Sequence, residues 1–256
     1  MLKKLVASGM IAGVAAGLIA TLLQLVFVVP LLFQAELYES GTLTHFAQAG
    51  HDHHAPAEAD AGHDHDSHSH DAEPVVEAQS QAGNPPNGFD FVRHGLTLLS
   101  NIAAFCGFGL LLVAAFGLAQ GQGIAVSTRM GALWGVAGFI AFHLAAGAGL
   151  PPELPGNFAA DLQARQIWWV GAGLLTALGL YSFAYMRGLG GIVLGALLIV
   201  LPHIMGAPHP HEFGGPVPPE LMALFVARSY AVAAITWLVL GAVAGMVWVR
   251  IQSQEA

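Results

Sequence analysis

Long uncharged apolar runs alternate with short polar segments along most of this 256-residue chain. A helix needs about 20 residues to cross the ~30 Å hydrocarbon core of a bilayer, because each residue adds about 1.5 Å. Six runs reach this length or come close to it: Leu5 to Phe33, Gly95 to Ala119, Met130 to Gly149, Ile167 to Met186, Leu189 to Gly206, and Ser229 to Val249. The pattern predicts an all-α, polytopic transmembrane helical bundle.

The number of spans depends on the fourth and fifth runs, which only Arg187 and Gly188 separate. We predict six spans joined there by a very tight turn, with five spans as the alternative. The expected division is a first transmembrane helix at 1–34, an external loop at 35–92 and five further transmembrane helices at 93–256. Glycines four residues apart in the first run, at Gly9, Gly13 and Gly17, suit close helix packing.

Basic residues that flank the runs predict the orientation. In the six-span arrangement five basic residues lie on the side of the N-terminus and three on the other: Lys3, Lys4, Arg129, Arg187 and Arg250 against Arg93, Arg165 and Arg228. Basic residues are enriched on the cytoplasmic side of membrane proteins. We therefore expect a multi-pass protein of a bacterial inner (cell) membrane, with a cytoplasmic N-terminus and a periplasmic loop.

Composition supports a lipid environment and excludes some functions. Hydrophobic residues make up 55% of the chain and charged residues only 9%, against about 25% charged in soluble domains. The eight basic residues are scattered, so we expect no nucleic-acid partner. A phosphate-binding Gly-x-x-x-x-Gly-Lys-Ser/Thr loop is absent, and no catalytic motif is recognisable, so we expect no enzyme.

The loop at 35–92 has the composition of a disordered metal-binding segment. It carries eight of the thirteen histidines, interleaved with aspartates: His45, His51, His53, His54, His63, His65, His68 and His70. Neutral imidazole is a good ligand for cobalt, nickel, copper and zinc. Few large apolar residues are present, so the empty loop is expected to be disordered. Since free histidine has a pKa of about 6.5, protons should weaken metal binding at pH 5 relative to pH 7.5.

Other polar residues lie within or beside the predicted spans. His143 and His203 fall inside them, where a polar side chain is costly and is functional by default. With the outer residues they form the predicted transport pathway: His143, Glu153, His203, His209, His211 and Glu212. The alternative is that His143 and His203 donate hydrogen bonds between helices. Trp168, Trp169, Trp237 and Trp248 lie near the ends of runs and are expected in the interfacial belt.

A short pattern repeats at the predicted outer ends. A Glu-Leu pair is followed by an arginine three times: Glu36 with Arg93, Glu153 with Arg165, and Glu220 with Arg228. The two side chains of each set either pair with each other or anchor the helices at the membrane surface, and we favour anchoring.

Three blocks of sequence resemble a known family. These are residues 5–17 (LVASGMIAGVAAG), the block from His143 through GLPPELPG to Arg165, Gln166, Ile167, Trp168 and Trp169, and residues 201–209 (LPHIMGAPH). They look like the CbtA-type proposed cobalt transporter subunit. The resemblance implies cobalt uptake for cobalamin synthesis in a bacterium, a small single-span, histidine-bearing CbtB-type partner, and five spans.

Together these observations predict a membrane subunit for uptake of a divalent transition metal, with cobalt as substrate and nickel or zinc as alternatives. The lipid bilayer and the CbtB-type subunit are the expected partners, and a homo-oligomer remains open. One alternative function is a membrane haem or redox protein that uses His143 and His203. Another is a metal sensor or chaperone that binds metal without transporting it.

Overall fold

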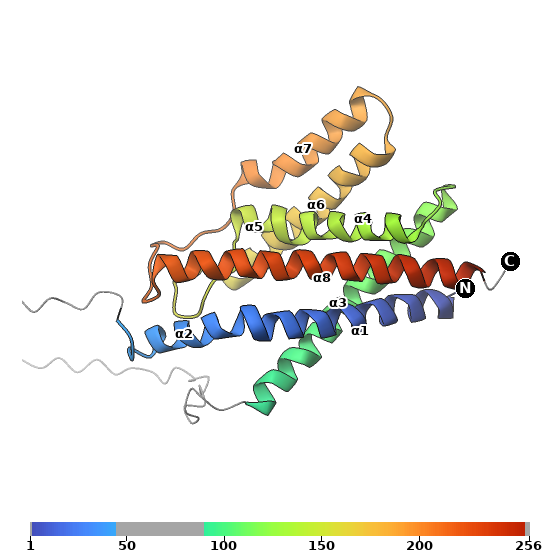
Figure 1. Cartoon of the computed structure of the whole chain (residues 1–256). Coiled ribbons are helices and arrows are strands. Elements are labelled where there is room, and N and C mark those ends of the chain that lie inside the picture. The colour runs from blue at the N-terminus through green and yellow to red at the C-terminus, as the bar shows by residue number, and fades with distance from the viewer. Residues whose placement is uncertain (1, 45–89, 254–256) are drawn as a thin grey trace, which may run out of the picture. The chain divides into compact units, whose positions relative to one another are not determined.

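The computed structural model of the chain describes residues 2–44 and 90–253. All eight loop histidines, from His45 to His70, lie outside the described residues. The prediction that their segment is disordered also concerns residues outside that range. In the described part the regular elements are helical and no strand is present, which confirms the all-α prediction. They are α1 (Leu2–Phe27), α2 (Val29–Glu39), α3 (Phe91–Gly121), α4 (Thr128–Phe139), the π-helix η1 (Ile140–Ala145), α5 (Ala146–Gly149), α6 (Leu162–Tyr185), α7 (Leu189–Met205) and α8 (Pro219–Ser253) (Figure 1).

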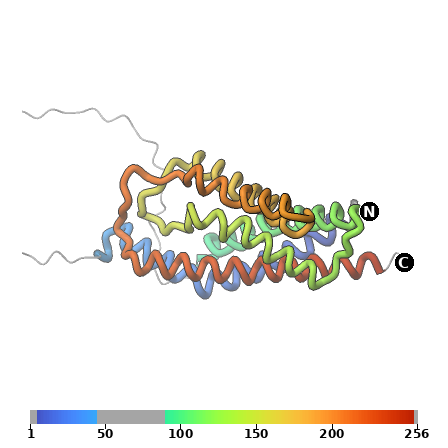
Figure 2. Tube along the Cα trace, turned by 90° about the horizontal axis from the view of Figure 1, so that it is seen from above, coloured from blue at the N-terminus to red at the C-terminus, as the bar shows by residue number. Residues whose placement is uncertain are grey.

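Within the described residues, five helical segments are long and apolar enough to cross a membrane: Leu5–Phe27, Phe91–Gly121, Thr128–Gly149, Leu162–Tyr185 and Pro219–Ser253. The fifth predicted span forms α7, which has 17 residues and therefore covers only about 25 Å. By length and composition five helices thus qualify as spans, as in the five-span alternative, and α7 falls short of the required length. Helix α7 runs from the end of the bundle where α6 ends to the end where α8 begins. As a result, α1 begins and α8 ends at the same end of the bundle (Figures 1 and 2). We call this the termini end and the opposite one the loop end.

Glycines allow two helix pairs to approach until their backbones touch. On α1 a Cβ added at Gly13 would lie 2.5 Å from the amide nitrogen of Cys106 on α3. Between α4 and α8, a Cβ at Gly241 would lie 2.7 Å from the Cα of Gly135. Such small-residue crossings are a main means of helix association in lipid. The packing predicted for the glycines of the first run is confirmed.

Large side chains fill the space among α1, α3 and α8. Phe116 and Leu240 are fully buried there, and Trp237 and Trp248 are nearly so. Trp237 lies near the middle of the 35-residue helix α8, so the interfacial position expected for it is wrong. Trp248 lies near the end of the same helix, and both rings are on the face that packs against the other helices.

A second buried cluster lies at the loop end, where Leu154 and Val217 pack with Leu31, Leu221 and Phe225. These contacts hold the connections at 150–161 and 206–218 against α2 and α8. The Phe158 amide also donates to the carbonyl oxygen of Gly214 at 3.0 Å, joining the two connections. The loop end is therefore an ordered surface.

Helices α6 and α7 form a hairpin attached to the bundle on one side. Gly188, with φ of +82°, allows the tight turn that was expected between them. Within the described part of the chain, α7 packs extensively only on α6, and α6 packs mainly on α7 and η1. Figure 1 shows the hairpin leaning away from the other helices.

Candidate functional site

Charges are separated between the two ends of the bundle. In residues 2–44 and 90–253 every carboxylate belongs to the loop end: Glu36, Glu39, Asp90, Glu153, Asp161, Glu212 and Glu220. At the termini end the charged residues of the same ranges are all basic: Lys3, Lys4, Arg129, Arg187 and Arg250. Only three arginines offset the seven carboxylates, so the loop end attracts cations.

Two of the three sequence repeats form ion pairs. Arg93 donates two hydrogen bonds to the Glu36 carboxylate, one of them at 3.1 Å from Nη1 to Oε2. Its guanidinium also lies 4.7 Å from the ring centre of Phe33. Arg165 pairs with Glu153 at 2.8 Å. Pairing, which the sequence left as the less favoured reading, is confirmed at both positions.

The third arginine has a different partner. Arg228 Nη1 donates to the carbonyl oxygen of Phe27 at 3.2 Å. That oxygen lacks its usual helical donors, because Pro30 has no amide hydrogen and the Leu31 amide donates to Val28 instead. Glu220 and Arg228 both lie on α8, so a pair between them would not join two separate segments of the chain. In place of the alternative pairing with Glu220, Arg228 supplies a hydrogen bond to the backbone where α1 ends and α2 begins.

His143 lies in the π-helix η1 among aromatic rings. A π-turn holds one more residue than an α-turn and is frequent at functional sites. The imidazole stacks on Phe139 at 6.1 Å between ring centres, and Trp237 Nε1 donates to His143 Nδ1 at 3.1 Å. Sequence reasoning missed the contact between Trp237 and His143, because nothing in the sequence relates positions 94 residues apart.

The hydrogen bond from Trp237 fixes what His143 can do. An indole nitrogen only donates, so Nδ1 of His143 must accept. A neutral ring then carries its hydrogen on Nε2, and its single lone pair is already in use. His143 therefore offers a hydrogen-bond donor to its surroundings, and a bound metal ion would have to displace Trp237.

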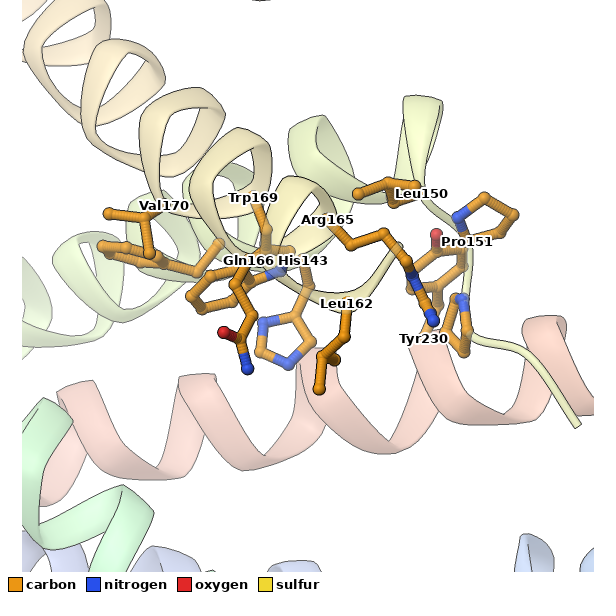
Figure 3. Close-up of a pocket in the computed structure, with 12 residues that line it drawn as sticks. His143, Leu150, Pro151, Leu162, Arg165, Gln166, Trp169, Val170 and Tyr230 are labelled. Atoms are coloured by element: carbon orange, nitrogen blue, oxygen red, sulfur yellow. The ribbon is translucent and has the colours of Figure 1, made fainter. Parts of the chain in front are cut away.

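An open-sided pocket of about 600 Å³ lies beside His143, between η1, α5, α6 and α8 (Figure 3). Its walls are mostly apolar. The polar side chains that line it are those of His143, Arg165, Gln166 and Tyr230. The Tyr230 hydroxyl is buried and finds no hydrogen-bond partner within the ranges that the structure covers.

His203 occupies a separate position, in the last turn of α7. Its ring meets Trp168 edge to face at 5.8 Å, and Trp168 Nε1 donates to the carbonyl oxygen of Pro202 at 3.2 Å. His203 does not line the pocket that contains His143. The structure thus does not bring these two histidines together.

The outer residues of the predicted pathway are exposed. His209 stacks on Phe213 at 6.1 Å, and its Nδ1 lies 3.2 Å from the Pro210 carbonyl oxygen. His211 and Glu212 are exposed beside it, and Glu153 is held by Arg165. Among the described residues no group of three or more His, Cys, Asp or Glu side chains is arranged to hold a metal ion.

Comparison with known proteins gives one match. The model of a family described as "probable cobalt transporter subunit (CbtA)" matches residues 2–249, nearly the whole chain. No curated protein and no solved structure matches.

Proposed function

The chain belongs to the CbtA family of probable cobalt transporter subunits, and from this premise we propose that it captures cobalt outside a bacterial cell and passes it inward. The proposed use of the metal is cobalamin synthesis. As a subunit the protein works with partners in the membrane, and we propose that one of them is a small, single-span, histidine-bearing CbtB-type protein.

The separation of charge between the two ends carries this proposal. Acidic residues gather at the loop end, and the described charges of the other end are all basic. The basic end matches the cytoplasmic side by the positive-inside rule. The acidic end then faces outward, where it raises the local concentration of cations.

We propose that the ion moves from the loop histidines to His209, His211 and Glu212, passes Glu153, and reaches His203. These side chains are exposed or half-buried and do not form a preassembled site. That supports transit, since conduction needs binding weak enough for release. We leave His143 out of the ligand set, because its lone pair already accepts from Trp237.

Cobalt accumulation in the host organism tests the proposal. A strain without the chromosomal copy would be complemented with the wild type, a deletion of residues 45–89, or His203→Ala, at matched protein levels. His94→Ala, at the start of α3 and outside the proposed route, serves as the histidine control. Nickel and zinc would be measured in parallel, because imidazole and carboxylate ligands also suit them.

We expect the deletion to lower cobalt accumulation when metal is scarce and to spare it when metal is abundant. His203→Ala should lower accumulation under both conditions, and His94→Ala under neither. If the strain complemented with the wild type accumulates no more cobalt than the same strain without any complementing copy, cobalt uptake is refuted. Normal accumulation by His203→Ala would remove that residue from the route.

A further inference from the structure

We propose that the pocket beside His143 binds a bilayer phospholipid, with its phosphate and ester oxygens accepting hydrogen bonds from the pocket and an acyl chain lying on the apolar wall. This binding site does not include His203, and it meets the route proposed for the metal ion only at the ion pair between Arg165 and Glu153.

The polar side chains of the pocket share one property, which is that each can donate a hydrogen bond. Arg165 has five N–H groups, of which the pair with Glu153 uses only part. The Gln166 amide, the Tyr230 hydroxyl and Nε2–H of His143 add further donors. A ligand that suits this set brings acceptor oxygens.

Tyr230 shows where an acceptor is missing. Its hydroxyl packs against Gly147, where a side chain would collide with it. The hydroxyl is buried and remains without a partner in the described part of the structure. Buried polar groups are almost always hydrogen-bonded. A ligand oxygen would supply the absent partner once the Tyr230 ring turns from Gly147 toward the pocket.

The order of the groups along the pocket matches the order of groups in a phospholipid. Figure 3 shows Arg165, Pro151 and Tyr230 toward one end, Val170 at the other, and His143 and Gln166 between them. A phospholipid presents a charged phosphate first, then ester oxygens, then acyl carbons. Arg165 and Tyr230 would meet the phosphate, His143 and Gln166 the esters, and Trp169 and Val170 the chain.

The position of the pocket gives a lipid access. Arg165 lies in the first turn of α6 at the loop end, which is head-group depth for a membrane span. Helices α6 and α8, which both line the pocket, have no extensive contact with each other in the described structure. The pocket is therefore open at the side of the bundle, toward the acyl region. Its volume of about 600 Å³ suits the glycerol region and part of one chain rather than a whole lipid.

Photo-crosslinking tests this site in the full-length protein. The protein would be placed in vesicles of phosphatidylethanolamine and phosphatidylglycerol that contain a phospholipid with a photoactivatable acyl chain. Labelled peptides would then be mapped by mass spectrometry. We expect labelling concentrated on residues 142–170 and around Tyr230. Tyr230→Phe and Gln166→Leu should each reduce this labelling about three- to tenfold, the effect of losing one hydrogen bond.

Tyr181→Phe provides a matched control, because Tyr181 lies on α6 outside the pocket and bonds to Gln122. Thermal unfolding of each variant shows that reduced labelling is not loss of fold. Uniform labelling of all helices would overturn the proposal. So would labelling by a fatty-acid probe but not by the phospholipid, or labelling abolished by saturating cobalt. The assay does not depend on transport, so it can succeed even if cobalt uptake is refuted.

Discussion

The two glycine crossings and the α6–α7 hairpin are held together in different ways. At the α1–α3 crossing the backbones touch, and large buried side chains lie on both sides of it. Helix α7 also meets α6 at glycines, but in the described residues it has no other extensive neighbour. The first region is confined from several sides, whereas the second is confined from one.

From this difference we expect the helices of the glycine crossings to act as a scaffold and the α6–α7 hairpin to be the part that moves. A helix held on one side can shift at low cost, and transport requires some element to change position. His203 lies on α7, and α6 forms one wall of the donor-lined pocket. His203 and one wall of the pocket thus lie on the hairpin, while the glycine crossings lie in the more closely packed part of the bundle.

The largest expected effect comes from filling the α1–α3 crossing. In Gly13→Ala the new methyl group would meet the backbone of Cys106, which has no room to move. We expect the free energy of unfolding to fall by about 2–3 kcal/mol, measured by denaturant titration in mixed micelles. Gly107→Ala is the control, since a methyl group there meets nothing; it should leave stability unchanged or raise it by up to about 1 kcal/mol. Equal losses in both variants would contradict a tight crossing.

A smaller effect is expected for the same substitution in the hairpin. A Cβ at Gly179 would lie 2.6 Å from Cγ1 of Ile199 and 2.7 Å from the carbonyl oxygen of Gly195. Because α7 can move away, we expect Gly179→Ala to cost about 1 kcal/mol, less than Gly13→Ala. Gly171→Ala, which has open space on the same helix, is the control. A cost as large as that of Gly13→Ala would show that the hairpin is held as firmly as the α1–α3 crossing.

The smallest effects are expected at the two ion pairs. Both are partly exposed to solvent in the absence of lipid, with side-chain exposures of 38% and 37% for Arg93 and Glu36, and 28% and 27% for Arg165 and Glu153. Exposed pairs contribute about 0.2–1 kcal/mol, so Glu36→Gln and Glu153→Gln should each lower the free energy of unfolding by no more than that. The loss should shrink as salt is added. Glu212→Gln, an exposed carboxylate that lies outside the helices, should change nothing. A cost several times larger for either pair would indicate a desolvated, structural role.

Much of the fold follows from local rules that a sequence contains. Run lengths predict the helices, and Gly9, Gly13 and Gly17 predict a close crossing, because both depend on spacing along a single helix. The pairing of Glu153 with Arg165 was within reach as well, since a short connection keeps the two side chains near each other. These properties need no knowledge of which helices are neighbours.

The remaining features depend on helix neighbours that the sequence does not specify. Arg228 was expected to anchor its helix or to pair with Glu220, but the carbonyl oxygen of Phe27, left without its helical donor by Pro30, offers it a partner on another helix. Trp237 could not be related to His143 without knowing that α4 packs on α8. The span expected from Ser229 proved to begin at Pro219, because α8 continues through Arg228 once that charge has a partner.

The contact between Arg228 and Phe27 also bears on the order in which the protein is assembled. Helix α1 leaves the ribosome long before α8, since the two residues are separated by 201 positions. During that interval the Phe27 carbonyl lacks the Arg228 donor and is left to water or lipid head groups. Insertion of α8 supplies the missing donor. The junction between α1 and α2 therefore gains its last hydrogen bond only when the final helix is in place.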